Sequence, residues 1–205
     1  MACSLLHEDR LRALGIAPVA GIDEAGRGAL AGPVVAAAVI LPEGYAHPHL
    51  NDSKQLSPRR RDAIYRELTT DPQVFWAVGL QEPEAIDRLN ILRATHAAMR
   101  DAVAALPVAA AHALIDGLPV EPFPLPQTAL VGGDGISLSI AAASVIAKVT
   151  RDRWMVALDG EHPGYGFAVH KGYATAAHLA SLRERGASTV HRRSFAPVAQ
   201  GEFGF

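Results

Sequence analysis

Three stretches of largely apolar residues in the first half of the chain predict buried β-strands. They run from Val19 to Asp23, from Pro33 to Leu41 and from Gln73 to Leu80, the last with an aromatic pair. Strands that are buried on both faces have nearly continuous apolar sequences, and half-buried strands alternate apolar with polar residues. The first two predicted strands lie on either side of a glycine-rich turn.

A helix is predicted directly after the second strand and its loop. Ser57 is a favourable N-cap and Pro58 suits the first helical position, so we expect a helix that extends to about Leu68. Its arginines at 59–61 are expected to face water or phosphate.

Two further helices are predicted from the spacing and size of the apolar residues. A longer helix is expected after Pro83 and should end before Pro107. The run from Ser139 to Lys148 is so rich in alanine and other small residues that we expect a helix packed closely on the sheet. Between them, the four prolines at 119–126 predict an extended connection.

The amino-acid composition excludes several classes of protein. The 205 residues, 49% hydrophobic and 20% charged, suit one compact domain with a sizeable core. A single cysteine, Cys3, excludes an internal disulfide and a cysteine-based zinc site. We see no signal-peptide pattern, because charged residues at 8–10 interrupt the N-terminus, and no apolar run spans a bilayer. We therefore expect a cytoplasmic protein without a membrane role.

The net charge of −2 conceals an uneven distribution. Residues 1–143 carry 11 basic and 16 acidic side chains, whereas residues 144–205 carry 8 and 5. The basic end of the chain could follow phosphates, and the acidic excess of the remainder could form a metal site. A solvated helix face explains the basic residues equally well.

Acidic residues stand at the ends of predicted strands and next to glycines. Asp23 and Glu24 follow the first strand, Asp116 ends a short strand from Ala113, and Asp134 lies between glycines before the small-residue helix. Adjacent strand residues point to opposite faces, so Asp23 and Glu24 can share a site only where the backbone bends. Mg²⁺ and Mn²⁺ prefer carboxylate oxygens, and two such ions about 4 Å apart can activate water and stabilise the leaving oxygen of a phosphodiester.

Other interpretations compete with this metal site. Acidic residues beside glycine are also ordinary turn chemistry. Gly26, Gly28 and Ala31 fit a weak dinucleotide-binding pattern, but that pattern needs a helix after the turn, and here a strand is expected. A module that binds hybrid duplexes without cutting them would gain nothing from four carboxylates. Zinc is disfavoured because no histidine pair stands at ligand spacing beside a carboxylate.

Several motifs together resemble ribonuclease HII. The resemblance extends from about residue 19 to Val198 and follows the order and spacing of the family throughout. The motifs are the segments 21–28 (GIDEAGRG), 52–54 (DSK), 90–95 (NILRAT), 115–117 (IDG), 139–148 (SIAAASVIAK), 170–173 (HKGY) and 191–195 (HRRSF).

The resemblance implies an α/β fold of the ribonuclease H type, a mixed β-sheet flanked by helices, with a small helical segment from about residue 174. It implies hydrolysis of RNA strands paired with DNA, and cleavage on the 5′ side of single ribonucleotides embedded in duplex DNA, leaving 3′-hydroxyl and 5′-phosphate ends. Four metal ligands for two Mg²⁺ or Mn²⁺ ions carry over by motif, with Asp23 as the bridge: Asp23, Glu24, Asp116 and Asp134.

Substrate contacts are expected from three groups of residues. The backbone of Gly26-Arg27-Gly28 could approach a ribose 2′-hydroxyl, the group that separates RNA from DNA. By resemblance, Tyr173 packs on the deoxyribose that follows the ribonucleotide. Phosphate contacts are expected from four cations, for which a solvated position is the alternative: Lys54, Lys148, Lys171 and Arg192.

The chain departs from the common family pattern at two places. Gly132-Gly133 stands where the family often has a lysine before the fourth aspartate, and Ala174 replaces a glycine. The first change makes Asp134 the least secure of the four expected ligands. We expect a monomer; the sequence indicates no protein partner.

Overall fold

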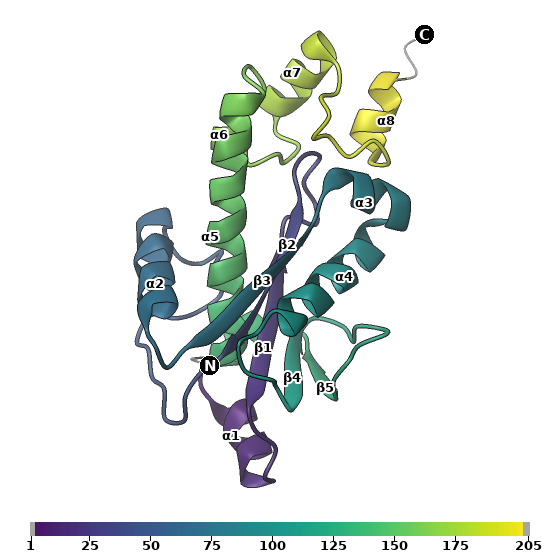
Figure 1. Ribbon diagram of the computed structural model, residues 1–205. Coiled ribbons are helices and arrows are strands. Elements are labelled where there is room, and N and C mark those ends of the chain that lie inside the picture. The colour runs from purple at the N-terminus through teal and green to yellow at the C-terminus, as the bar shows by residue number, and fades with distance from the viewer. Residues whose placement is uncertain (1–2, 203–205) are drawn as a thin grey trace.

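The computed structural model describes residues 3–202 and contains one central sheet with helices on both of its faces (Figure 1). The strands are β1 (Val19–Ala25), β2 (Val34–Ile40), β3 (Phe75–Gln81), β4 (His112–Asp116) and β5 (Gln127–Leu130). The helices are α1 (Leu6–Ala13), α2 (Pro58–Thr70), α3 (Pro83–Leu89), α4 (Ile91–Ala104), the 3-10 helix η1 (Gly133–Gly135), α5 (Leu138–Glu161), α6 (Phe167–His170), α7 (Ala176–Arg185) and α8 (Ala196–Glu202).

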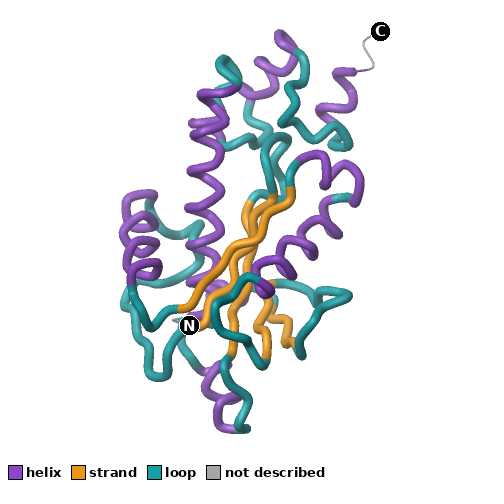
Figure 2. The backbone as a smooth tube through the Cα atoms, in the orientation of Figure 1, coloured by secondary structure: helices purple, strands orange, loops and turns teal. Residues whose placement is uncertain are grey.

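The sheet is mixed, as expected, and its order is β3-β2-β1-β4-β5 (Figure 2). Strands β1, β2 and β3 form an antiparallel meander, whereas β4 runs parallel to β1 and β5 runs parallel to β4. The register pairs Ile22 of β1 with Ile115 of β4. The next residue of each strand is an aspartate, so the parallel pairing delivers Asp23 and Asp116 to the same edge of the sheet.

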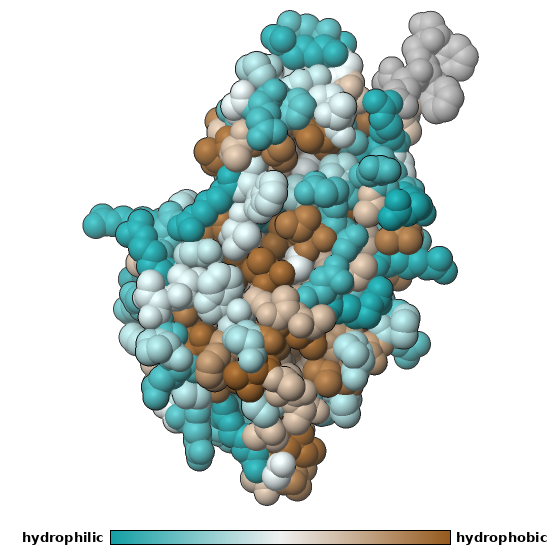
Figure 3. Space-filling model, in the orientation of Figure 1, coloured by the Kyte–Doolittle hydropathy of each residue, from teal (hydrophilic) through white to brown (hydrophobic). Residues whose placement is uncertain are grey.

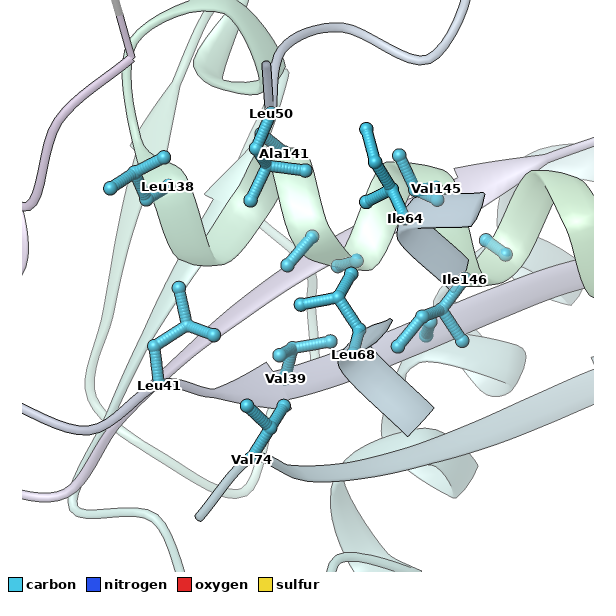
Figure 4. Close-up of a cluster of buried hydrophobic side chains, with 14 of the residues drawn as sticks. Val39, Leu41, Leu50, Ile64, Leu68, Val74, Leu138, Ala141, Val145 and Ile146 are labelled. Atoms are coloured by element: carbon cyan, nitrogen blue, oxygen red, sulfur yellow. The ribbon is translucent and has the colours of Figure 1, made fainter. Parts of the chain in front are cut away.

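Each face of the sheet buries its own hydrophobic cluster. On one face, Val39 and Leu41 pack with side chains of α2 and α5 such as Leu68 and Ile146 (Figure 4). On the other face, Ala36 and neighbouring residues pack against α4. All seven residues of β2 are buried, which explains its uninterrupted apolar sequence.

The small residues of α5 allow the close packing that the sequence indicates. The side chains of Ala141, Ala142 and Ala143 are fully buried. On the facing strand, a Cβ atom at Gly21 would clash with the backbone of Ser139 and Ile140. Gly21 therefore lets β1, which carries Asp23, lie directly on the first turn of α5.

The structure corrects several details of the predicted elements. The helix expected from residue 83 to 107 is two helices, because Asn90 has φ 71° and its side chain caps α4 by accepting a hydrogen bond from the Arg93 amide at 3.1 Å. Helix α5 continues beyond Lys148 to Glu161. Arg61 does not face solvent freely; its guanidinium donates to the carbonyls of Ser53 and Leu56. Helix α1 and strand β5 were not predicted.

The C-terminal segment is helical, as the resemblance implied, and α7 and α8 lie together beyond one end of the sheet (Figure 1). On the face shown in Figure 3, hydrophobic residues gather in the middle along the line of β3, and hydrophilic residues cover the margins. Of the helices that the structure describes, none combines the length and hydropathy that a membrane crossing requires.

Candidate active site

Three of the four expected carboxylates meet at one edge of the sheet. Asp23, Asp116 and Asp134 offer oxygen atoms that all lie within 4.8 Å of one another. Asp23 is 4% exposed and Asp134 is 7% exposed, so both are largely withdrawn from water. Within the described residues this is the one cluster of acidic, histidine or cysteine side chains that could hold a metal ion, and it contains no histidine.

Glu24 lies beside this cluster but is not a member of it. Strand β1 continues straight through Ala25, so Asp23 and Glu24 alternate in direction and the expected bend between them does not occur. The Glu24 carboxylate contacts the Arg27 guanidinium at 3.3 Å. Both acidic residues still line one cavity of about 470 Å³, because that cavity lies at the end of the strand.

The carboxyl groups of the cluster lie close together although their negative charges repel one another. Burial raises the pKa of Asp23 well above its usual range, and the nearby Glu24 and Asp116 raise it further. Burial, followed by the charge of Asp116, likewise raises the pKa of Asp134. Carboxylates that are buried together without a cation are unfavourable, and hard divalent cations with oxygen ligands relieve this repulsion. The donor set therefore fits Mg²⁺ or Mn²⁺.

Asp134 reaches the cluster on a loop instead of a strand. It is the middle residue of η1, which begins after Gly132 in the left-handed conformation at φ 67°. The amide of Gly133 donates a hydrogen bond of 2.7 Å to the Asp116 carboxylate, and this bond joins the two ligand-bearing segments. A Cβ atom at Gly133 would press on the side chain of Ile140. The two glycines that depart from the family pattern thus suit this loop.

The glycine turn after β1 lies over a buried arginine. Gly26 has φ 97°, and a Cβ atom there would clash with the side chain of Arg151. Gly28 has open space around it, because a Cβ atom added there would meet no other atom within 4 Å. The side chain of Arg27 is half exposed. The turn therefore presents its backbone to the cavity with little side-chain cover.

Two buried guanidinium groups hydrogen-bond the backbone of this turn and of the segments next to it. Arg151 donates to the carbonyls of Ala31, Pro33 and Lys171 at 2.9–3.1 Å. Arg192 donates to the carbonyls of Gly32 and Arg27 at 3.0 and 2.9 Å. Both side chains are fully buried, and burial, together with the charge of Arg151, lowers the pKa of Arg192 to about 9. They connect the glycine turn to the segment that carries Tyr173.

Tyr173 and two of the expected lysines line the acidic cavity. Tyr173 is 37% exposed, and the Lys148 ammonium lies 5.9 Å from the centre of its ring. Lys148 also contacts Asp152 at 2.6 Å. The Lys54 ammonium lies 3.5 Å from the Asp134 carboxylate. Burial alone would lower the pKa of Lys54, but Asp134 and other carboxylates raise it, so this lysine stays charged beside the cluster.

Two of the residues expected to contact phosphate, Lys171 and Arg192, do not line this cavity. Arg192 is 0% exposed and holds backbone carbonyls, so it does not present its charge to the surface. The ammonium of Lys171 donates to the carbonyl of Ala168, and its side chain lines a neighbouring cavity beside Arg153. Arg192 differs from the sequence prediction because a cation in a basic segment gives no sign of its own burial.

Sequence reasoning overlooked two polar residues at the site. Arg151 stands three positions after Lys148 on α5, a spacing that places both on one helix face, and this spacing was the available signal. The hydroxyls of Ser144 and Ser53 lie 2.8 Å apart, and a hydrogen bond from Ser144 to Asp23 partly offsets the raised pKa of Asp23. Serine in a run of alanines gave no comparable signal.

Solved structures share this architecture. Ribonuclease H2 from Pyrococcus horikoshii superposes with a TM-score of 0.71 at 24% identity, covering 90% of this chain and 96% of that chain. Bst-RNase HIII in complex with Mn²⁺ superposes with a TM-score of 0.67 at 21% identity, covering 90% of this chain and 68% of that chain. These likenesses show that the fold is of the ribonuclease H type.

The sequence assigns the chain more narrowly within that class. The family model for ribonuclease HII matches residues 20–198. Ribonuclease HII of Geobacillus thermodenitrificans is 54% identical over 194 residues, which cover 95% of this chain and 74% of that protein. The chain belongs to the ribonuclease HII family. It is a ribonuclease, of a divalent-metal-dependent family that hydrolyses the RNA strand of RNA/DNA hybrids.

Proposed function

We propose that this protein cuts duplex DNA on the 5′ side of single embedded ribonucleotides, in addition to hydrolysing longer hybrids, and leaves 3′-hydroxyl and 5′-phosphate ends. The observation that carries the proposal is the composition of one cavity. Asp23, Glu24 and Asp116, the glycine turn at 26–28 and Tyr173 all line the same space of about 470 Å³. A reaction centre and a surface that reads one sugar therefore lie side by side.

In this proposal, Asp23, Glu24, Asp116 and Asp134 bind two divalent ions. The proximity and burial of the three aspartates support the assignment, and Glu24 borders the same cavity. Such ions supply an activated water and stabilise the charge on the leaving oxygen. The four side chains fix where those charges are placed. The Mn²⁺ complex of the structurally similar Bst-RNase HIII supports manganese as one usable ion, with magnesium as the other.

Recognition of the ribonucleotide is assigned to the backbone of the turn. Gly28 offers open space for a sugar, and the 2′-hydroxyl can both donate and accept hydrogen bonds. The partly exposed ring of Tyr173 would pack on the next deoxyribose, which lacks that hydroxyl. The Arg151 side chain lies against Gly26 and donates to the carbonyl of Lys171, so one side chain supports both reading elements.

Phosphates are assigned to the cations at the rim of the cavity. Lys54 has a side chain that is 77% exposed, and Lys148 lies between Asp152 and the ring of Tyr173. Lys171 remains a proposed contact on the adjoining surface, one that would require release of its bond to Ala168. Arg192 supports the turn and is not proposed to touch phosphate. The protein would act as a monomer and a single catalytic unit in the cytoplasm, in ribonucleotide and RNA-primer removal.

The test uses labelled duplexes that contain one ribonucleotide, four ribonucleotides or none, each with Mg²⁺, Mn²⁺ or a chelator. Metal-dependent cleavage on the 5′ side of the lone ribonucleotide, absent from the all-DNA duplex, is expected. Cleavage of the four-ribonucleotide duplex alone would leave the hydrolytic activity intact but refute the roles given to the glycine turn and Tyr173.

Two variants separate chemistry from recognition. Asp23→Asn should reduce cleavage by more than about 1,000-fold while sparing binding, since it removes a charge that the reaction needs. Arg27→Ala should reduce cleavage by less than about tenfold, because the backbone of the turn does the reading and the Arg27 side chain is half exposed. Equal losses in the two variants would contradict the assignment of recognition to the backbone.

A further inference from the structure

The beginning of the chain lies across the loop that carries Asp134. The backbone of Ser4 accepts a hydrogen bond from Leu138 and donates one to Ile136, both at 3.1 Å. The thiol of Cys3 donates to the carbonyl of Asp134 itself at 3.3 Å. Residues 3–5 therefore pair with the loop between η1 and α5 through a short bridge of backbone hydrogen bonds.

Helix α1 then places a carboxylate beneath the same loop. Glu8 is 0% exposed. One oxygen of its carboxylate accepts hydrogen bonds from the hydroxyl of Ser137 at 2.7 Å, and from the hydroxyl and amide of Ser139 at 2.6 and 3.0 Å. Glu8 is about 130 residues away in sequence from these partners, so the contact joins the first helix to the longest one.

The position of this carboxylate suits the start of α5. Ser137 is the N-cap of α5, and its hydroxyl accepts from the Ile140 amide at 3.2 Å while donating to Glu8. The amides at a helix N-terminus favour a negative charge, and hydrogen bonds to a charged acceptor are stronger than neutral ones. Glu8 therefore orders the first turn of α5 from outside that helix.

Asp134 is the ligand that most needs such support. Asp23 and Asp116 lie on strands whose backbones are fixed by neighbouring strands, whereas Asp134 lies on a single turn of 3-10 helix. The charge of Asp116 opposes the approach of the Asp134 carboxylate. Only two residues separate Asp134 from Ser137, so a shift of the α5 cap would move the ligand directly.

We propose that Glu8 is a positioning residue for the metal site: by binding Ser137 and Ser139 it holds the loop so that the Asp134 carboxylate stays beside Asp23 and Asp116. The inference rests on the proposed role of Asp134 as a ligand. Substitution of residues that orient metal ligands commonly weakens metal affinity about 10- to 100-fold, and Glu8 acts one step further away. Loss of its carboxylate should weaken metal binding by about 5- to 10-fold.

The test measures Mn²⁺ binding to the full-length, metal-free protein without nucleic acid, by the electron paramagnetic resonance of free Mn²⁺. The variants are Glu8→Ala, Glu8→Gln and Asp134→Asn. Asp9→Asn is the matched control, because Asp9 is the next residue of α1 with a side chain that is 57% exposed. Glu8→Ala and Asp134→Asn should both weaken Mn²⁺ binding, Glu8→Gln should weaken it less because its amide oxygen still accepts, and Asp9→Asn should leave it unchanged.

A second readout excludes a purely stabilising role. The Mn²⁺ concentration for half-maximal hybrid cleavage should rise by the same factor in Glu8→Ala, while the rate at saturating Mn²⁺ stays within about twofold of the wild type. A lower melting temperature with unchanged Mn²⁺ affinity would overturn the proposal, since Glu8 would then support only the fold.

The remaining outcomes are also decisive. If Glu8→Ala does not fold, Ser139→Ala, which removes the hydroxyl contact with the Glu8 carboxylate but keeps the amide contact, should still weaken Mn²⁺ binding; unchanged affinity in this variant would refute the proposal. Unchanged Mn²⁺ affinity in Asp134→Asn would refute the premise of the proposal, which is that Asp134 is a metal ligand. Because the Mn²⁺-binding measurements contain no nucleic acid, failure of the ribonucleotide-cleavage proposal would leave their result unaffected.

Discussion

Replacing Asp23 by asparagine should make the metal-free protein more stable while it destroys catalysis. Asp23 is buried, and its pKa lies well above the usual range because of burial and the charges of Glu24 and Asp116. Its ionised form is therefore unfavourable in the folded protein at neutral pH. Asparagine has nearly the same shape, retains an oxygen that can accept the 2.7 Å hydrogen bond from the Glu24 amide, and carries no charge.

The size of the effect follows from the linkage between ionisation and folding. At a pH above both the folded and unfolded pKa values, each unit of upward shift costs the folded protein about 1.4 kcal/mol. Because the pKa of Asp23 is raised well above the ordinary value of 3.8, Asp23→Asn is expected to stabilise the metal-free protein. For a chain of this length, each kcal/mol of added stability raises the melting temperature by roughly 2 to 4 °C, so the variant should melt at a higher temperature than the wild type.

The pH dependence has a definite direction. Because the folded pKa is raised, the contribution of Asp23 to stability is most favourable below the unfolded value of 3.8, and it is lost as the pH rises through the folded value. The difference in stability between Asp23→Asn and the wild type should therefore be largest at pH 8 and should shrink toward acid.

Thermal and chemical denaturation in a chelating buffer, at pH 8 and pH 5, would measure this difference. Asp62→Asn is the control, because its side chain is 48% exposed beside Arg153 and should change stability by less than about 1 kcal/mol. Added Mg²⁺ should stabilise the wild type more than Asp23→Asn. A variant that melts at or below the wild-type temperature at pH 8 would refute the reasoning that the buried, ionised Asp23 carboxyl group destabilises the metal-free protein.

Two further predictions concern the framework around the site. Gly21→Ala should cost about 1 to 3 kcal/mol in urea denaturation, because its Cβ would clash with the backbone of Ser139, whereas Gly160→Ala on the open side of α5 should be neutral or stabilising; equal stabilities would contradict the close packing. Burial, and then the charge of His178, lowers the pKa of His191 from 6.5 to about 4, so stability should fall as the pH drops between these values, and less so in His191→Gln; an unchanged pH profile in this variant would count against the assignment.

The sequence predicted those parts of the site that local patterns encode. Asp116 could be assigned because an apolar run ends there before a glycine, and the close helix after Ser139 was evident from its small residues. The mixed sheet and the presence of its three early strands are confirmed; β1 and β2 are buried as predicted, whereas β3 is mostly only partly buried. Glu24 shows the limit of such reasoning, because whether a strand bends after Asp23 depends on pairing with β2, which persists through Ala25.

What could not be predicted depends on contacts between distant parts of the chain. Arg151 and its acceptor at Pro33 are 118 residues apart, and Glu8 and Ser139 are 131 apart. A charged residue has the same local pattern whether it is solvated or buried against carbonyl groups. The burial of Arg192 therefore became evident only when the path of the glycine turn was known.

The site is supported from two sides, and the two supports have separate consequences. The carboxylates rest on the strands and on the α5 cap, which Glu8 binds from the N-terminal side. The glycine turn and the Tyr173 segment rest on Arg151 and on Arg192 from the C-terminal segment. Damage to the first support should change metal dependence, whereas damage to the second should change the choice between a ribonucleotide and a deoxyribonucleotide. Under the proposed function, chemistry and recognition therefore share one cavity without sharing one framework.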